Sequence, residues 1–206
     1  MITRHHVHLD RAWKTPQFWL IWAALCLNVT AGIAVISMAS PMFQEVFGAK
    51  LLGIDTATAT AMDAMQRARV VAAAAGLVGL ISLFNSFGRL FWASLSDRLG
   101  RKTTYCVFFI LGIALYCTLP TLGHMGLAGM FVLTVCVIIS MYGGGFATLP
   151  AYLADIFGTQ MVGAIHGRAL TAWSVAGIIG PLVIAAVRQG QLAACVATSL
   201  VYDRTL

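Results

Sequence analysis

The sequence is poor in charged residues. Of its 206 residues, 13 are lysine or arginine and 7 are aspartate or glutamate, so that 10% of the chain is charged; a soluble domain has about 25%. Hydrophobic residues make up 60% of the chain, and the mean hydropathy is +0.87. This composition argues against a soluble globular domain and is typical of a chain that lies mostly within a membrane.

Several patterns that carry chemistry are also missing. The five cysteines form no C-x-x-C pair and four of them lie in apolar runs, which indicates packing rather than a disulfide or a metal site. The absence of an H-E-x-x-H motif and of a nucleophile elbow argues against a membrane enzyme, and we expect no cofactor. His5, His6 and His8 could bind a metal, although such a tract is also typical of a solvated tail.

The formal net charge is +6, but the basic residues lie between apolar segments and form no continuous face interleaved with aromatic residues. The sequence therefore indicates no nucleic-acid partner. Instead, the lysines and arginines predict the orientation of the chain in the membrane. The side that carries more of them is predicted to be the cytoplasm, which places the amino terminus inside. The basic residues on that side are Arg4, Arg11, Lys14, Arg98, Arg101, Lys102 and Arg168.

Five apolar segments are long enough to cross the hydrocarbon core of a bilayer, which takes about 20 helical residues. The predicted fold class is therefore an all-α membrane protein with five transmembrane helices. The triplet Gly143 to Gly145, together with Pro150, is expected to interrupt the fourth span. The predicted organisation is a cytoplasmic tail over 1–16, spans at 17–44, 70–96, 103–119, 127–154 and 170–187, an external loop over 45–69, and an aberrant or truncated tail over 188–206.

One arginine lies inside a predicted span. Arg89 falls within the second span, whereas all seven acidic residues fall in tails, loops or the edges of spans. A cation within a bilayer costs about 2.5 to 3.5 kcal/mol and by default faces a bundle interior or a water-filled cavity. Either an anionic substrate is its counter-ion, or the side chain reaches the membrane interface, since Asp97 is only about 12 Å away along a helix.

A charged loop follows the second span, with the pattern Ala93-x-Leu95-Ser96-Asp97-Arg98-x-Gly100-Arg101-Lys102. This pattern resembles the signature loop of the major facilitator superfamily, in which glycine usually stands where this chain has Ala93. Asp97 at a helix end could hold Arg98 and Arg101 in a charge network that closes the inner face. The resemblance thus implies a gating loop of Asp97, Arg98, Gly100, Arg101 and Lys102, and the alternative is a simple positive-inside loop.

A narrower resemblance covers most of residues 12 to 187. It is carried by the segments TPQFW at 15–19, NVTAG at 28–32, FNSFGR at 84–89, YGGGFATLPAY at 142–152 and TAWSVAG at 171–177. Together these segments resemble the second half of the oxalate/formate antiporter family. The resemblance implies that residues 17–187 form a half-bundle equivalent to helices seven to eleven of a twelve-helix carrier. The implied partner is then a missing amino-terminal half of six helices.

The resemblance also implies a substrate site. Arg89 falls on the arginine that is thought to grip the substrate carboxylate in oxalate-type members, whereas Trp173 stands where a partner lysine is expected. A single cation favours a monocarboxylate over a dianion, and Trp173 either lines the pocket or serves in packing. Four further side chains could line the same cavity or hydrogen-bond between helices: Asn85, Tyr142, Thr148 and Tyr152.

The predicted function is that of a fragment of a secondary transporter for small organic anions, with monocarboxylates as the favoured substrates and alternating access as the mechanism. The alternative is an inactive remnant of a split or frameshifted carrier gene that has no transport activity alone. The expected location is a bacterial inner membrane, in contact with lipid.

Overall fold

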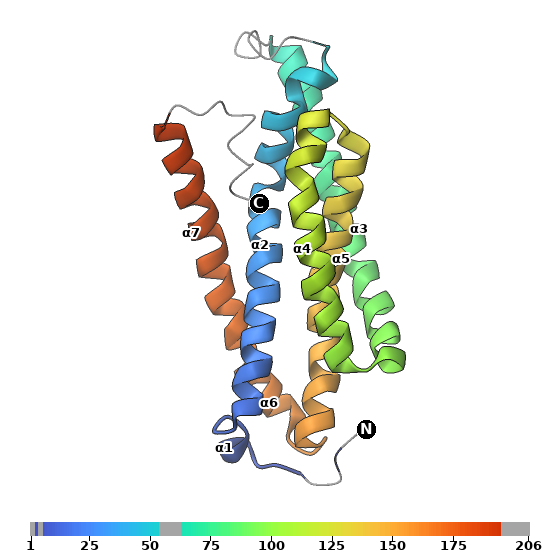
Figure 1. Cartoon of the computed structure of the whole chain (residues 1–206), viewed down its shortest axis with the longest axis vertical. Helices are drawn as coiled ribbons and strands as arrows, with labels where there is room; N and C mark the ends of the chain where they lie inside the picture. Colours follow the sequence, from blue (N-terminus) through green and yellow to red (C-terminus); the bar gives the residue numbers. More distant parts are fainter. Residues whose placement is uncertain (1–2, 4–5, 54–62, 195–206) are drawn as a thin grey trace.

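A computed structural model of the chain describes residues 3, 6–53 and 63–194. Within these residues every regular element is a helix, and long helices run side by side along the longest axis (Figure 1). The elements are α1 (Leu9–Ala12), α2 (Pro16–Leu51), α3 (Ala64–Leu99), α4 (Arg101–Met125), α5 (Ala128–Phe157), α6 (Val162–Ala169) and α7 (Thr171–Ala193).

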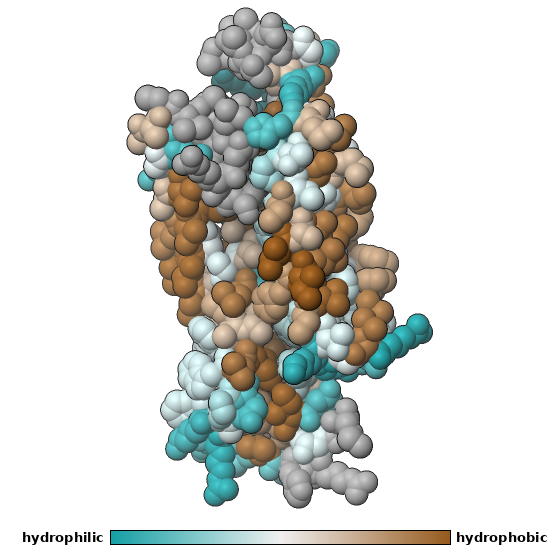
Figure 2. All heavy atoms as spheres, viewed as in Figure 1, coloured by the Kyte–Doolittle hydropathy of each residue, from teal (hydrophilic) through white to brown (hydrophobic). Residues whose placement is uncertain are grey.

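Five helical segments in the described residues are long and apolar enough to cross a membrane, with α6 and α7 forming one of them. Figure 2 shows apolar side chains gathered over the middle of one face and hydrophilic ones near its two ends. A membrane protein needs this pattern, because its middle contacts hydrocarbon while its ends meet water. The chain is thus an all-α integral membrane protein, and the predicted fold class is confirmed.

The helices extend beyond the predicted spans. α2 continues to Leu51 and α3 begins at Ala64, so both described flanks of the expected external loop are partly helical; residues 54–62 of that loop lie outside the described residues. A capping box sets the start of α3. In it, Asp63 Oδ1 accepts a hydrogen bond from the backbone of Gln66 at 2.7 Å, and Gln66 Oε1 accepts one from the backbone of Asp63 at 3.0 Å.

The triplet Gly143 to Gly145 does not interrupt the fourth span, because α5 is continuous from Ala128 to Phe157. Each of the three glycines instead faces a neighbouring helix. A Cβ at Gly143 would overlap the backbone oxygen of Asn85, one at Gly144 would lie 2.6 Å from the Cβ of Trp92, and one at Gly145 would lie 3.1 Å from Oδ1 of Asn28. The glycines therefore permit close helix packing rather than a break.

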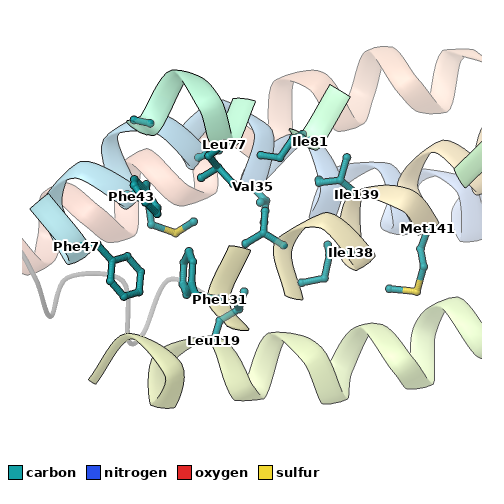
Figure 3. Packing of buried hydrophobic residues seen from close by; sticks show 14 of the residues in the cluster. Val35, Phe43, Phe47, Leu77, Ile81, Leu119, Phe131, Ile138, Ile139 and Met141 are labelled. Carbon is teal, nitrogen blue, oxygen red and sulfur yellow. The ribbon is translucent and has the colours of Figure 1, made fainter. Parts of the chain in front are cut away.

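Apolar side chains of α2, α3, α4 and α5 fill the core between these helices (Figure 3). Phe47 and Phe131 meet edge to face with their ring centroids 5.0 Å apart, a geometry that aromatic pairs prefer. Val35 and Leu77 lie in the same cluster. The four helices thus share one continuous core.

α7 lies beside α2 and leans away from the other helices toward its end (Figure 1). A Cβ at Gly180 of α7 would lie 2.9 Å from the carbonyl oxygen of Thr30 on α2. α7 continues past Arg188 to Ala193, so the first residues of the predicted truncated tail are helical. Residues 195–206 of that tail lie outside the described residues.

We call the end of the bundle that holds α1 and α6 the lower end, as it is drawn in Figure 1, and the opposite end the upper end. A second apolar cluster joins α1 and α6 to the lower parts of α2, α5 and α7. Its fully buried members include Leu25, Leu153 and Ile165. The cluster holds the start of α7 beside the ends of α2 and α5.

Candidate functional site

Arg89 projects from the part of α3 that lies closest to α5. The neighbouring Gly88 makes this approach possible, because a Cβ there would overlap the backbone of Ser140 on α5. The side chain of Arg89 is exposed, and it lies near enough to Tyr142 on α5 to interact with it electrostatically. Arg89 thus lies on an open face of the bundle, beside the close contact between α3 and α5.

Tyr142 begins a row of three aromatic side chains that runs from α5 to α7. The ring centroids of Tyr142 and Phe146 on α5 lie 5.3 Å apart, and those of Phe146 and Trp173 on α7 lie 5.8 Å apart. We call Arg89, Tyr142, Phe146 and Trp173 the Arg89 cluster, which draws on three helices.

The members of the cluster differ in exposure. Tyr142 is 9% exposed, whereas 49% of Trp173 is exposed. The ring of Tyr142 rests on Gly32 of α2, where a Cβ would lie 2.7 Å from the ring carbon Cγ. Gly32 therefore makes room for Tyr142, and Trp173 presents an open aromatic surface beside it.

Asn85 lies one helical turn from Arg89 and packs against Gly143 of α5. Its Oδ1 is buried and has no hydrogen-bond partner among the described residues, and the same holds for Oδ1 of Asn28 on α2. Buried polar atoms usually have partners, so these two amide oxygens, on either side of the glycine triplet, are unsatisfied polar groups within a closely packed contact.

The structure does not bring Thr148 or Tyr152 into the Arg89 cluster. Thr148 is fully buried, and its hydroxyl donates to the carbonyl oxygen of Gly144 in its own helix at 2.9 Å. The ring of Tyr152 packs against Tyr105 of α4 at 5.8 Å. Both side chains thus have contacts within the bundle, on a different face of α5 from Tyr142.

Sequence reasoning missed one member of the Arg89 cluster, Phe146, and the glycine that packs against Tyr142, Gly32. Phe146 lies four residues after Tyr142, and that spacing places two side chains on one helix face. It could have been found from this spacing alone. Gly32 carried no comparable signal, because its role depends on which residue of another helix packs against it.

The predicted gating loop joins α3 to α4 at Gly100, whose φ of 87° favours glycine. The guanidinium of Arg101 pairs with Asp97, donates to Ser96 and lies 3.6 Å from Oδ2 of Asp155, measured from Nε. Only 16% of its side chain is exposed. Arg101 therefore ties α3 to α5 from the start of α4.

The loop differs from its expected form in two ways. Arg98 was expected to share Asp97 with Arg101, but Arg98 and Lys102 are exposed, and among the ion pairs of the described residues Asp97 pairs with Arg101. Asp155, which no motif indicated, completes the network. Asp155 follows Asp97 by 58 residues, so no local sequence pattern could indicate that the two belong to one network.

The described part of the amino-terminal segment packs on the lower end of the bundle. The backbone N–H groups of Thr3 and Val7 donate to the carbonyl oxygens of Asp155 at 3.1 Å and Phe157 at 2.9 Å. His8 caps α1 by accepting from the backbone of Asp10. No group of three potential metal ligands occurs within the described residues; His5 lies outside them.

A groove of about 340 Å³ opens between α2, α4 and α5, and Tyr142 of the Arg89 cluster is one of its lining residues. Most of its lining is apolar, with Phe108 and Ile113 as examples, and Asn28 and Tyr142 contribute polar atoms. Arg89 is not among its lining residues. The groove therefore lacks the cation that would bind an anion.

Comparison with known proteins gives a family and two relatives. The model of the Major Facilitator Superfamily matches residues 4–181. The chain is 28% identical over 190 residues to the oxalate:formate antiporter of Oxalobacter formigenes, which covers 90% of this chain and 37% of the antiporter. It is 29% identical over 165 residues to apicoplast pyruvate carrier 1 of Toxoplasma gondii, which covers 80% of this chain and 27% of the carrier. No solved structure matches the chain.

Proposed function

The chain belongs to the Major Facilitator Superfamily, a family of transporters, and from that premise we propose that it forms part of a secondary transporter of small organic anions. Support comes from the names of the two relatives, an oxalate:formate antiporter and a pyruvate carrier. The chain spans about a third of the length of these relatives. The proposal therefore includes a second half-bundle as the partner that completes the carrier.

The observation that carries this proposal is the position of Arg89. Arg89 is exposed and follows Gly88, where α3 packs against α5, and no ion pair within the described residues involves it. A cation at this depth in a membrane is costly without a counter-ion. An anionic substrate bound at the open face would supply that counter-ion. Extension of the side chain toward the membrane interface is the alternative.

The surroundings of Arg89 favour a monocarboxylate. Trp173, Tyr142 and Phe146 form an aromatic surface with a single hydroxyl and a single indole N–H. Arg89 would hold the carboxylate with paired hydrogen bonds, while the aromatic surface would contact the uncharged remainder. Asn85 is proposed to contribute a polar contact one turn away. A second carboxylate would have no cation to balance it at this surface.

Alternating access in this family proceeds by rocking of one half against the other around a site near the membrane midplane. We assign the network of Arg101, Asp97 and Asp155 to the stabilisation of the state that is closed at the cytoplasmic side. Because Arg101 bonds α3 and α5 at once, opening that rearranges these helix ends would break the network.

The alternative function is an inactive remnant of a split or frameshifted carrier gene. The neighbouring coding sequence distinguishes the two. An intact reading frame that encodes six further spans and is expressed with this chain supports a two-part carrier. A frame interrupted by stop codons supports a remnant. In either case we propose the bacterial inner membrane as the location.

Counterflow of labelled pyruvate or formate tests the transport proposal. Vesicles would contain this chain together with the other half-bundle, with Arg89→Ala and Arg98→Ala as matched variants. We expect Arg89→Ala to reduce uptake at least tenfold, because the substrate loses its counter-ion, and Arg98→Ala to retain uptake, because Arg98 is exposed at the loop. Equal uptake by wild type and Arg89→Ala would refute the anchor role.

A further inference from the structure

A second pair of charged side chains joins two membrane helices far from the Arg89 cluster. Glu45 lies six residues before the end of α2, and Arg188 lies five residues before the end of α7. The guanidinium of Arg188 donates to Oε1 of Glu45. The two side chains are 23% and 26% exposed, so that the pair is largely shielded from solvent. Sequence analysis placed Glu45 in an external loop, whereas the structure places it within a helix that packs against α7.

The carboxylate of Glu45 is only half satisfied. Its second oxygen, Oε2, is buried and has no hydrogen-bond partner among the described residues, and the amide nitrogen of Gln191 is in the same state. Gln191 follows Arg188 by three residues, so the two side chains lie on neighbouring positions of one face of α7. A buried carboxylate oxygen without a donor costs free energy. A proton on the carboxylate would remove the charge that makes this oxygen costly.

Among the described residues, several further charged or titratable groups lie on the elements that pack near Glu45. On α2 itself, the ammonium of Lys50 donates to the carbonyl oxygens of Gly123 and His124 on α4, at 3.2 and 3.3 Å. His124 itself is the titratable side chain that α4 contributes at this end. The upper half of α5 has no charged residue.

Two cations and one acid belong to the start of α3, the remaining element that packs against α2 at the upper end. Arg67 and Arg69 are exposed, and Asp63 is occupied in the capping box of that helix. Arg188 is therefore the cation that directly contacts Glu45 in the described structure.

From this geometry we propose that Glu45 is a proton-binding site, and that its protonation releases the upper end of α7 from α2. A proton from solution binds the carboxylate, the ion pair with Arg188 loses its negative partner, and no covalent bond other than the new O–H is formed. Because α7 also carries Trp173 at its lower end, the proton would change how firmly this helix is held beside the Arg89 cluster. The proposal concerns the protein's conformation and does not require transport.

The distance between α2 and α7 at the upper end, measured between two spin labels, tests the proposal. The labels would be attached at Ser37→Cys and Gln189→Cys, two exposed positions, in the full chain with its native cysteines replaced by serine and reconstituted in lipid nanodiscs. Measurements at about pH 8 and about pH 3 compare the two conditions, and the lower value is chosen because an arginine partner opposes protonation of a carboxylate. We expect one short distance at high pH and a longer or broader distribution at low pH.

Variants separate the roles of the two partners. Glu45→Gln should show the long distribution at both pH values, because the neutral amide mimics the protonated acid. Arg188→Gln should show it as well, without a response to pH. Asp63→Asn is the matched control at another acid of the upper end and should keep the response of the wild type.

Two results would overturn the proposal. One is a wild-type distance that does not change with pH. The other is a response to pH that persists in Glu45→Gln, which would assign the proton to a different group. Circular dichroism of each variant checks that the helices are retained. If Glu45→Gln does not fold, the test rests on Arg188→Gln. A spin-label distance that still changes with pH in Arg188→Gln would contradict the proposed release.

Discussion

The contact between α3 and α5 differs in kind from the contact between α2 and α7. α3 and α5 pack so closely that glycine backbone on one helix contacts the backbone or a side chain of the other. These contacts occur at Gly88, Gly143 and Gly144. A buried hydrogen bond from Nε1 of Trp92 to Oγ of Ser140, 3.1 Å long, crosses the same contact. Within the described residues, no ion pair crosses this central contact, which is held by packing and one neutral hydrogen bond.

α2 and α7 are instead joined by polar groups near their two ends. Trp22 donates to Oγ1 of Thr171 at 2.9 Å at the lower end, and Glu45 pairs with Arg188 at the upper end. Between them the helices meet closely at Gly180. Polar pairs can be exchanged for water or a proton, whereas interlocked backbones cannot. Arg89 and Tyr142 therefore lie on a rigid pair of helices, and Trp173 lies on a helix that can be released.

The largest expected effect comes from filling the rigid contact. In Gly143→Leu the new side chain would overlap the backbone of Asn85, and overpacking of a well-packed site costs about 1 to 3 kcal/mol or more. We expect most of the protein to aggregate on extraction into detergent, measured by size-exclusion chromatography. Gly79→Leu is the matched control on α3, because nothing lies within 4 Å of its Cβ position. Similar profiles for both variants would contradict the close-packing role.

A change on the releasable helix should alter selectivity rather than folding. Trp173→Lys places a second cation beside Arg89, and two cations can balance a dianion. We expect uptake of labelled oxalate relative to formate to rise about tenfold, equivalent to about 1.4 kcal/mol, in vesicles that contain the completed carrier. Trp173→Phe serves as the control, because it removes the indole without adding charge. An unchanged ratio in Trp173→Lys would place Trp173 outside the substrate surface.

The smallest effect is expected at the lower tie of the releasable helix. Trp22→Phe removes the hydrogen bond to Thr171 and retains most of the apolar surface. Because this bond is exposed, its loss should lower the free energy of unfolding by about 0.5 to 1.5 kcal/mol. Thermal unfolding in detergent would measure this loss, with Trp19→Phe as the comparison at a more exposed tryptophan of the same helix. A loss well above this range would show that the lower tie is not a weak contact.

Local patterns in the sequence predicted much of this molecule. The length of the apolar segments predicted the membrane helices, and the run of charged residues that begins at Asp97 predicted the connection between α3 and α4. Arg89 was found because a cation within an apolar run is rare. Phe146 was missed although its spacing to Tyr142 on the same helix was a usable local signal. Asp155 and Gly32 were not found, since each acts through a residue of another helix and carries no local signal of that partnership.

The sequence alone determined that the chain is a bundle of membrane-spanning helices, because hydropathy and charge act on each segment separately through its contact with lipid or water. Only the tertiary structure decided which side chains meet. The approach of Gly143 to Asn85, the stacking of Tyr142 over Gly32 and the pairing of Glu45 with Arg188 depend on the rotation and height of one helix against another. Those quantities are set by the packing of all the helices together, so that no single segment contains them.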